Sequence, residues 1–226
     1  MEMLFFIIFI VILVVIIANL GQYSEQVRTE RREAETEYIG RVGEETTEAI
    51  VSRIKECEYI LTNLYIPTAK GGTTEIDLVA FTNRGLLVLE TKNISGKIHG
   101  DEDSDQWFVS VYTQYKYFHN PIKQNATHTK YLDKAVAVNI PIYSIIVFSD
   151  RCSLEYLPDS FNDVYICQMS TLRETIKEIF DENPVCVPLL VLSTVYGRVK
   201  KYANPSAEVI RKHKEYVRSK NYDNKV

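Results

Sequence analysis

The sequence has no closely spaced pair of cysteines, no recognisable internal repeat and no low-complexity tract. Structural zinc sites and thiol redox motifs are built on close pairs such as C-x-x-C, so neither is expected here. Free, buried thiols in a reducing compartment explain the four cysteines better: Cys57, Cys152, Cys167 and Cys186.

Charged residues are missing from the eighteen positions between Met3 and Leu20, which are almost entirely Ile, Val, Leu and Phe. A helix of that length reaches roughly 27 Å, close to the hydrocarbon thickness of a bilayer. A cleaved signal peptide is the alternative, but the segment lacks a basic n-region and an A-x-A cleavage site. We therefore predict an uncleaved transmembrane anchor at residues 1–21.

Basic residues are absent before this apolar stretch, whereas Arg28, Arg31 and Arg32 follow it closely. Because basic residues beside a span favour the cytoplasmic side, the rest of the chain is expected to face the cytoplasm. The predicted location is the cell membrane, with a single span and a cytoplasmic C-terminal domain. Residues 22–39 are densely charged with few apolar positions, which predicts a solvated helical stalk.

The remainder of the 226 residues suffices for one main domain of ordinary size. A helix is predicted from Gly43, because Ile50, Ile54 and Cys57 fall on one face. Apolar and β-rich runs predict strands at residues 59–66, 76–81, 86–91, 106–112, 142–148 and 164–168, with further helices from Asn120 and over 171–180. This order indicates a mixed α/β fold.

The chain ends in an apolar element and a basic tail, together residues 183–226. Residues 185–195 are apolar but too few to span a membrane, so a buried element of undecided type is expected. After Gly197, nine basic residues stand against three acidic ones. Ser206 is a suitable cap for a helix that begins near Ala207.

The most informative local feature is a predicted β-hairpin around Asn83-Arg84-Gly85. A two-residue turn at Asn83-Arg84 places Asp77 directly opposite Glu90. A turn at Arg84-Gly85 places Asp77 opposite Lys92 and diagonal to Glu90, still within about 8 Å. A three-residue loop would shift the pairing by one, unless Gly85 forms a bulge that restores it. Both two-residue turns gather Asp77, Glu90 and Lys92 on one face.

Carboxylates buried in a sheet need charged partners or a metal. Magnesium suits this group, because it binds one or two carboxylates and shares its shell with water and substrate phosphate. Lys92 could then orient the attacking water and stabilise developing negative charge. The alternative is a purely structural set of cross-strand ion pairs, in which Lys92 and Arg84 neutralise Asp77 and Glu90.

Five ordered blocks resemble the nuclease-related domain, NERD, of the PD-(D/E)xK nuclease superfamily. They are Gly43-Glu44; Glu75-Ile76-Asp77; Gly85 with Val88-Leu89-Glu90-Thr91-Lys92-Asn93; Gly96 and Trp107; and Asn120-Pro121-Ile122-Lys123-Gln124. The match covers about residues 40–150 of a domain predicted at residues 40–182. It implies a restriction-endonuclease-like core, in which helices flank a mixed central sheet.

The resemblance also implies a catalytic site made of Glu44, Asp77, Glu90, Lys92 and Gln124. Asp77, Glu90 and the backbone carbonyl of Thr91 would surround Mg²⁺ or Mn²⁺. Gln124 falls on the predicted buried face of its helix, with His128, Tyr131, Ala135 and Val138. Its alternative role is that of a satisfied core amide.

Glu44 has an alternative role as a helix carboxylate favoured by the dipole, and Glu45 beside it leaves the register open. Residues 101–105 resemble a calcium loop only superficially, because Gln106 and Tyr112 replace the required glycine and glutamate, so a solvated loop is expected. Lone histidines are more often surface or core residues than catalysts, so His119 and His128 receive no role.

The sequence thus predicts a membrane-anchored, metal-dependent nuclease whose resemblance indicates DNA as the substrate. Since the net charge is −4, phosphate binding must come from the metal, Lys92 and a local patch such as Lys212, Lys214 and Arg218 in the tail. The tail could also contact anionic lipid. The competing hypothesis is a catalytically silent, membrane-tethered adaptor that holds nucleic acid or protein on the same fold.

Overall fold

The computed structural model describes the backbone of residues 2–69 and 71–223. Within the terminal helices, the side chains of residues 2, 4, 5, 8, 10–12, 14, 15 and 220–223 lie outside this description. Two compact units make up the chain, Met1–Val42 and Gly43–Val226.

Helix α1 (Glu2–Val51) runs without interruption through the predicted stalk and into the domain. The sequence had suggested a break near Gly40, but an isolated glycine costs a helix only about 1 kcal/mol. Gly43 is needed for close packing, because a Cβ atom there would stand 2.6 Å from the Cβ of Asn93.

The anchor predicted at residues 1–21 falls partly outside the described residues. Among the described residues, no helix combines the length and the apolar character needed to cross a bilayer.

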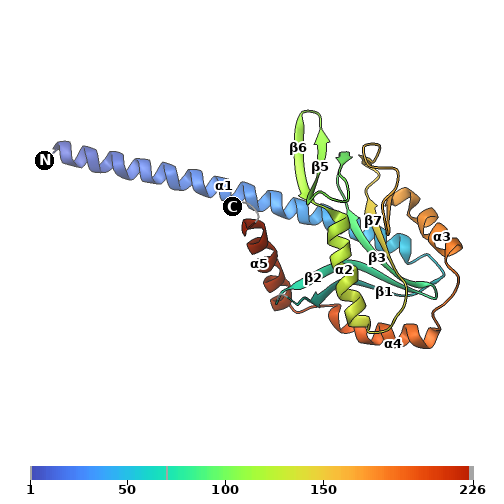
Figure 1. The fold of residues 1–226 in the computed structure, drawn as a ribbon. Coiled ribbons are helices and arrows are strands. Elements are labelled where there is room, and N and C mark those ends of the chain that lie inside the picture. Colours follow the sequence, from blue (N-terminus) through green and yellow to red (C-terminus); the bar gives the residue numbers. More distant parts are fainter. Residues whose placement is uncertain (1, 70, 224–226) are drawn as a thin grey trace. The chain divides into compact units, whose positions relative to one another are not determined.

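The larger sheet is mixed, as the sequence predicts, and its strand order is β1-β2-β3-β7-β9 (Figure 1). The first three strands pair antiparallel, and β3, β7 and β9 run parallel. Their bounds are β1 Cys57–Pro67, β2 Thr73–Thr82, β3 Gly85–Lys92, β7 Ile142–Phe148 and β9 Val164–Gln168.

Helices cover both faces of this sheet. On one face, α2 (Pro121–Val136) and α4 (Leu189–Val199) contribute Leu132 and Leu192 to a buried apolar cluster. On the other face, α3 (Leu172–Glu182) packs with the last turns of α1 through Ile176 and Val51. The apolar element of undecided type is therefore helix α4, part of the domain core. Short 3₁₀ turns precede α3 and follow α4, at Met169–Thr171 and Lys200–Tyr202, and the basic tail forms α5 (Ala207–Asp223).

The buried positions of β2 change face at Asp77. Ile76 packs on the α2 and α4 side, and a regular alternation would send Leu78 to the same side. Instead Leu78 packs in the opposite layer and Val79 takes the α2 side.

The neighbouring strand changes face at the same level. Leu64 pairs with Ile76, so the next residue back, Asn63, stands opposite Asp77. Asn63 has a φ of 52°, a left-handed conformation that asparagine tolerates better than most residues. This local twist brings Asp77 to the point where the two layers meet.

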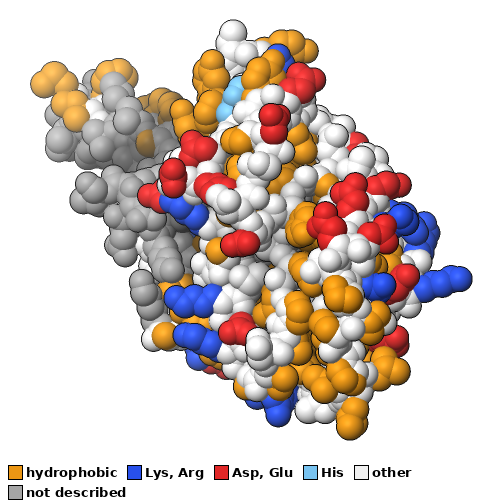
Figure 2. Space-filling model, turned by 45° about the vertical axis from the view of Figure 1, so that its right-hand side comes forward, with side chains coloured by type: hydrophobic (Ala, Val, Ile, Leu, Met, Phe, Trp, Pro, Cys, Tyr) orange, Lys and Arg blue, Asp and Glu red, His pale blue; other side chains and the backbone are white. Residues whose placement is uncertain are grey.

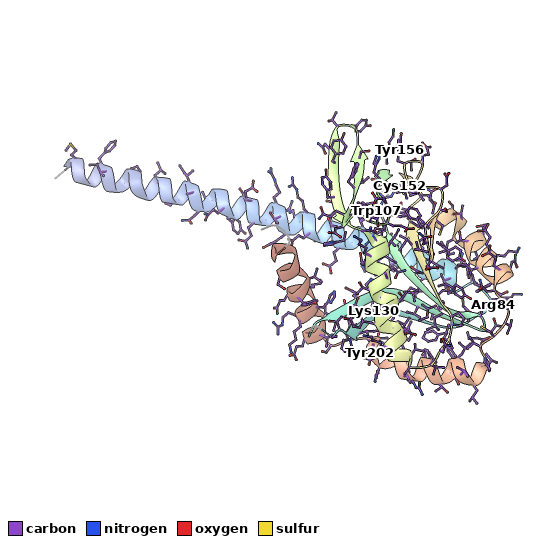
Figure 3. The ribbon with its side chains drawn as sticks, viewed as in Figure 1. Arg84, Trp107, Lys130, Cys152, Tyr156 and Tyr202 are labelled. Atoms are coloured by element: carbon purple, nitrogen blue, oxygen red, sulfur yellow. The ribbon has the colours of Figure 1, made fainter. Side chains whose placement is uncertain are left out.

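A second sheet of four strands has the order β6-β5-β4-β8. Its strands are β4 Gly96–His99, β5 Gln106–Val111, β6 Gln114–His119 and β8 Cys152–Ser153. Of these, the sequence predicted only the one around Trp107. That side chain is fully buried and stacks at 6.3 Å on Phe148 of β7, which fixes the second sheet against the first (Figure 3).

Candidate active site

The hairpin between β2 and β3 adopts the first of the two predicted turns. Thr82 pairs with Gly85 and Leu78 with Leu89, so Asp77 stands opposite Glu90. Gly85 has a φ of 140°, and a Cβ atom there would meet the Pro141 carbonyl oxygen at 2.4 Å. The register of this turn therefore depends on a residue without a side chain.

Asp77 lies just beyond the last paired residues of the hairpin, where β2 separates from β3. Its Oδ2 accepts a hydrogen bond of 2.8 Å from the backbone N–H of Thr91. The half-buried Asp77 carboxylate thus accepts the N–H that a backbone carbonyl of β2 would accept in a regular antiparallel pair.

The Thr91 carbonyl belongs to the same edge of β3. The carbonyl of Lys92, the next residue, accepts the Ser149 N–H at 3.0 Å on the β7 side. Because consecutive residues of a strand direct their backbone groups to opposite edges, the Thr91 C=O points with its N–H towards Asp77. A carboxylate and a carbonyl oxygen thus share one edge.

Glu90 is 1% exposed, and each of its carboxylate oxygens has a partner. Oε1 accepts from Lys92 Nζ at 2.5 Å, and Oε2 lies 3.1 Å from His128 Nε2. Burial raises the pKa of Glu90, but Lys92 and His128 outweigh it and lower the pKa to about 2. Glu90 is therefore ionised.

Lys92 joins the sheet to α2, because its Nζ also donates to Gln124 Oε1 at 3.0 Å. Burial alone would lower the pKa of Lys92, but Glu90 and Asp77 raise it above its usual value. Lys92 therefore remains an ammonium ion. The structural alternative for Arg84 is wrong: its guanidinium donates to the carbonyls of Phe180 and Asn183, at the opposite end of β3 (Figure 3).

Glu44 faces the same group of charges from α1. It is half-buried, between the buried residues Gly43 and Thr47, whereas Glu45 is exposed. The Thr47 hydroxyl accepts from Thr91 Oγ1 at 3.1 Å, which fixes α1 against β3. Burial, then Glu75 and Glu90, raise the pKa of Glu44.

Asp77 carries the largest electrostatic cost of the group. Burial, followed by the charges of Glu90 and Glu44, raises its pKa well above the ordinary value. Three carboxyl groups thus share a single ammonium ion, so this cluster favours additional positive charge or a bound proton.

His128 belongs to this site, although no role was predicted for it. Its Nε2 contacts Glu90, and its Nδ1 lies 2.7 Å from Thr74 Oγ1. The available signal was its position one helical turn after Gln124, on the same predicted face. The buried face itself is centred slightly differently from the prediction, on Pro121, Asn125, His128, Leu132 and Val136, with Gln124 at its border.

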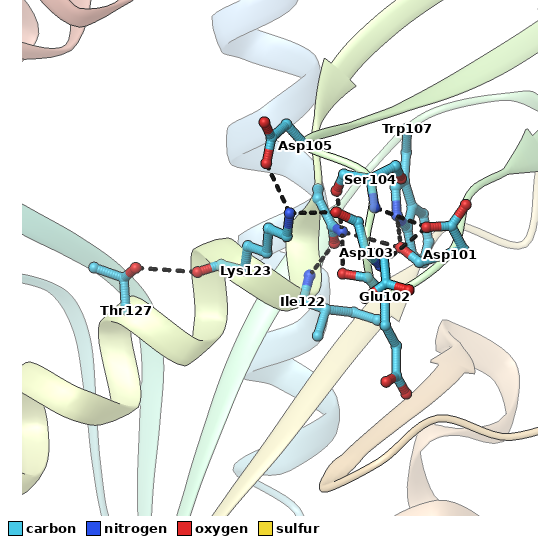
Figure 4. Close-up of polar contacts among 10 residues, drawn as sticks. Asp101, Glu102, Asp103, Ser104, Asp105, Trp107, Ile122, Lys123 and Thr127 are labelled. Atoms are coloured by element: carbon cyan, nitrogen blue, oxygen red, sulfur yellow. Dashed lines mark hydrogen bonds and ion pairs between the residues drawn. The ribbon is translucent and has the colours of Figure 1, made fainter.

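Asn120 joins the start of α2 to the loop at 101–105, which Figure 4 shows beside the first turn of that helix. Its Oδ1 accepts the Ile122 N–H at 2.9 Å, which caps the helix. Its Nδ2 contacts three loop carbonyls, those of Asp101, Glu102 and Ser104, at 3.0, 3.3 and 2.7 Å. The acidic loop is thus a support for α2.

The three basic tail residues lie on α5, and they are not part of this cluster. Lys212 pairs with Glu208 at 2.7 Å. On the same helix, His213 Nε2 lies 3.4 Å from Glu75 Oε2, and its Nδ1 lies 2.9 Å from Thr73 Oγ1. These contacts fasten α5 to β2, the strand that carries Asp77.

The raised pKa of Asp77 predicts an effect on stability. The Asp77 carboxyl group binds a proton more tightly in the folded chain than in the unfolded chain. The free energy of unfolding therefore falls as pH rises from the pKa of the unfolded state through that of the folded state. Asp77→Asn keeps an acceptor for the Thr91 N–H but removes the charge. With chelator present, we expect it to be more stable than wild type above about pH 7, by about 1.4 kcal/mol for each tenfold difference in proton affinity. The advantage should shrink towards about pH 4.

Urea unfolding at several pH values measures this difference. Asp105→Asn is the matched control, because a hydrogen bond from Lys123 lowers the pKa of Asp105 and its replacement should not stabilise the fold. Equal stabilisation by both substitutions, or none by Asp77→Asn, would contradict the expectation.

Comparison with known proteins agrees with this geometry. Over 182 residues the chain is 25% identical to an uncharacterized protein of Bacillus anthracis. The aligned segment covers 80% of this chain and 84% of that protein. No solved structure matches the chain. Residues 39–149 match the family model described as "Nuclease-related domain", a range that contains all five predicted site residues. Residues 39–149 of the chain therefore form a nuclease-related domain.

Proposed function

We propose that this protein is a metal-dependent nuclease that hydrolyses phosphodiester bonds of DNA. The family gives it a nuclease-related function. The observation that carries the finer proposal is the arrangement of Asp77, Glu90 and Lys92 where β2 separates from β3. Two carboxylates and an ammonium ion converge there, and one of the two carboxylates, Asp77, has a raised pKa.

The residues fit a divalent cation by their chemistry. Asp77, Glu90 and the Thr91 carbonyl offer oxygen atoms, which Mg²⁺ and Mn²⁺ prefer. A cation would also offset the repulsion among the three carboxyl groups. The described residues contain no cluster of three or more His, Cys, Asp or Glu side chains arranged for a metal, and the proposed set requires only two side chains.

When bound, the cation would supply Lewis-acid stabilisation of the phosphate and lower the pKa of a coordinated water. The protein's own groups then have separate tasks. Lys92 remains protonated and can stabilise negative charge that develops on the phosphate. Gln124 fixes the direction of its ammonium group, and His128 holds Glu90 in place. Glu44, whose pKa is raised, is suited to exchanging a proton near the attacking water.

Substitutions should separate these roles. Asp77→Asn and Glu90→Gln are expected to lose cation binding and cleavage together, because an amide attracts a hard cation more weakly. Lys92→Ala should keep cation binding but lose cleavage by about 10²–10³-fold or more. His128→Ala should weaken cation affinity by about 10–100-fold, as for other residues that orient a ligand. Glu44→Gln and Gln124→Ala should also reduce the rate.

Calorimetry measures cation binding, and cleavage is followed on single- and double-stranded DNA and RNA with Mg²⁺, Mn²⁺ or chelator. Lys177→Ala on α3 is a control, because this exposed lysine forms an ion pair with the exposed Asp181 on the same helix and lies outside the charged cluster. If the wild-type chain binds no divalent cation and cleaves none of these substrates, the adaptor hypothesis replaces the nuclease.

We further propose that residues 1–21 anchor the protein in the cell membrane with the domain in the cytoplasm. The support is the sequence alone: eighteen uncharged positions from Met3, followed by three arginines. Deletion of residues 1–21 should move the protein from the membrane fraction to the soluble fraction, and a C-terminal tag should resist protease in intact cells. A full-length chain in the soluble fraction would refute the anchor.

The tail is proposed to bind nucleic acid through Lys212, Lys214 and Arg218. Its support is the attachment of α5 to β2 through His213, close to Asp77 in the strand. Replacing the three residues by Glu should weaken DNA binding and reduce the slope of log affinity against log salt by about 0.7–0.9 per lost phosphate contact. An unchanged slope would mean that the tail only faces solvent, and loss of binding to anionic vesicles alone would assign it to lipid.

A further inference from the structure

The outward face of the second sheet carries aromatic side chains in register. His99 pairs with Phe108 and Phe108 with Tyr117, which forms one cross-strand row. Lys97, Ser110 and Tyr115 form the next row. Residues directly opposite one another share a face, so both rows lie on the side away from Trp107 and the core.

The rings form a continuous cluster. His99 stacks on Phe108 with centroids 4.5 Å apart and planes within 7°. Phe108 contacts the rings of Tyr115 and Tyr117 at 5.8 and 5.7 Å. From outside the strands, Tyr156 lies 4.8 Å from His99. We call these five residues the aromatic platform.

The platform is open to solvent. Tyr115 is 64% exposed and Tyr117 63%, and Tyr112 in the adjoining turn is fully exposed. Hydrophobic side chains also gather at the top of the molecule in Figure 2, at the level of the β5–β6 hairpin in Figure 1. Grouped exposed rings contribute little to folding and commonly mark an interaction surface.

The charge of this sheet differs from that of the chain. Strands β4, β5 and β6 contain two lysines and two histidines but no Asp or Glu, in a protein of net charge −4. Beside the platform, Lys97 Nζ lies 2.9 Å from the hydroxyl of the platform residue Tyr156. Acidic residues flank this sheet at Glu155, next to Tyr156, and in the loop at 101–105 beside α2. An anionic partner with flat, apolar groups complements such a surface.

The platform is directly connected to the candidate active site. Strand β4 begins four residues after Lys92, and β6 ends immediately before Asn120, the cap of the helix that carries Gln124. A partner bound along β4 and β6 is therefore held by strands that lead directly to Lys92 and to the start of α2.

We infer that the aromatic platform binds single-stranded nucleic acid, whose unpaired bases stack on Tyr115, Tyr117 and Tyr156 while Lys97 contacts the backbone. The inference rests on the proposed nuclease function and specifies its substrate class. Bases of a duplex are already stacked on one another, so they cannot use the rings, whereas exposed bases of single strands stack on aromatic side chains. Because Lys97 is the cation assigned to it, the platform itself should add little to the dependence of affinity on salt.

The test uses the full-length chain in mild detergent, with Lys92→Ala to prevent cleavage and chelator throughout. Fluorescence anisotropy measures binding of an oligothymidylate and of a duplex of equal length. Tyr115→Ala with Tyr117→Ala should weaken single-strand binding about tenfold or more and change duplex binding little. Tyr115→Phe with Tyr117→Phe keeps the rings and should bind like the parent. Tyr23→Ala, which removes an exposed tyrosine outside the platform, is the matched control.

The salt slope of log affinity for the single strand should change by less than about 0.7 between the parent and the variant with both tyrosines replaced by alanine, since tyrosine neutralises no phosphate and each neutralised phosphate contributes about −0.7. Equal loss on both oligonucleotides, or no loss in the alanine variant, would overturn the inference, provided that the variant unfolds at the parent temperature. Loss of binding to neutral phosphatidylcholine vesicles instead would assign the platform to membrane and overturn it too. If the chain that retains Lys92 cleaves single strands equally well with and without the two tyrosines, only this inference is refuted. If binding requires the two tyrosines but the chain that retains Lys92 cleaves nothing, only the proposed nuclease function is refuted.

Discussion

The buried carboxylate of Glu90 is the constraint around which the domain is organised. Removing an ionised carboxylate from water is costly unless its charge is compensated and its oxygens accept hydrogen bonds. Lys92 meets one requirement from the same strand, and His128 meets the other from α2. His128 in turn contacts Thr74 on β2. A single acidic side chain therefore links a helix to two adjacent strands, in addition to the apolar packing of α2 on the sheet.

The charges in the cluster around Glu90 do not balance. Glu90 is fully compensated, but Asp77 and Glu44 bring two further carboxyl groups to a pocket with one ammonium ion. A sequence selected for stability alone would replace them by amides or apolar residues. Their presence at the separation of β2 and β3 agrees with a binding site that is completed by a cation and a phosphate.

The hairpin could be predicted from the sequence because its turn, its alternation and its charged positions all imply one register. The other strands of the larger sheet, β1, β7 and β9, were also predicted from apolar and β-rich runs. The left-handed Asn63 could not be predicted, since many asparagines adopt ordinary conformations, and the change of face at Asp77 depends on it. His128 was missed for a similar reason: a histidine is equally compatible with surface, core and active site until its partners are known. The second sheet has short strands, of which only the one around the tryptophan has a clear pattern.

Asn120 has a consequence for how the domain moves. Because one amide both caps α2 and holds three carbonyls of the loop at 101–104, the loop cannot open without uncapping the helix. The two segments therefore form one cooperative unit in the sense of native-state hydrogen exchange, with a shared opening free energy. An opening that begins at the exposed acidic loop would release the first turn of α2 and with it the amide that orients Lys92. The acidic loop, remote in sequence from the charged cluster, thereby sets how often that cluster is fully assembled.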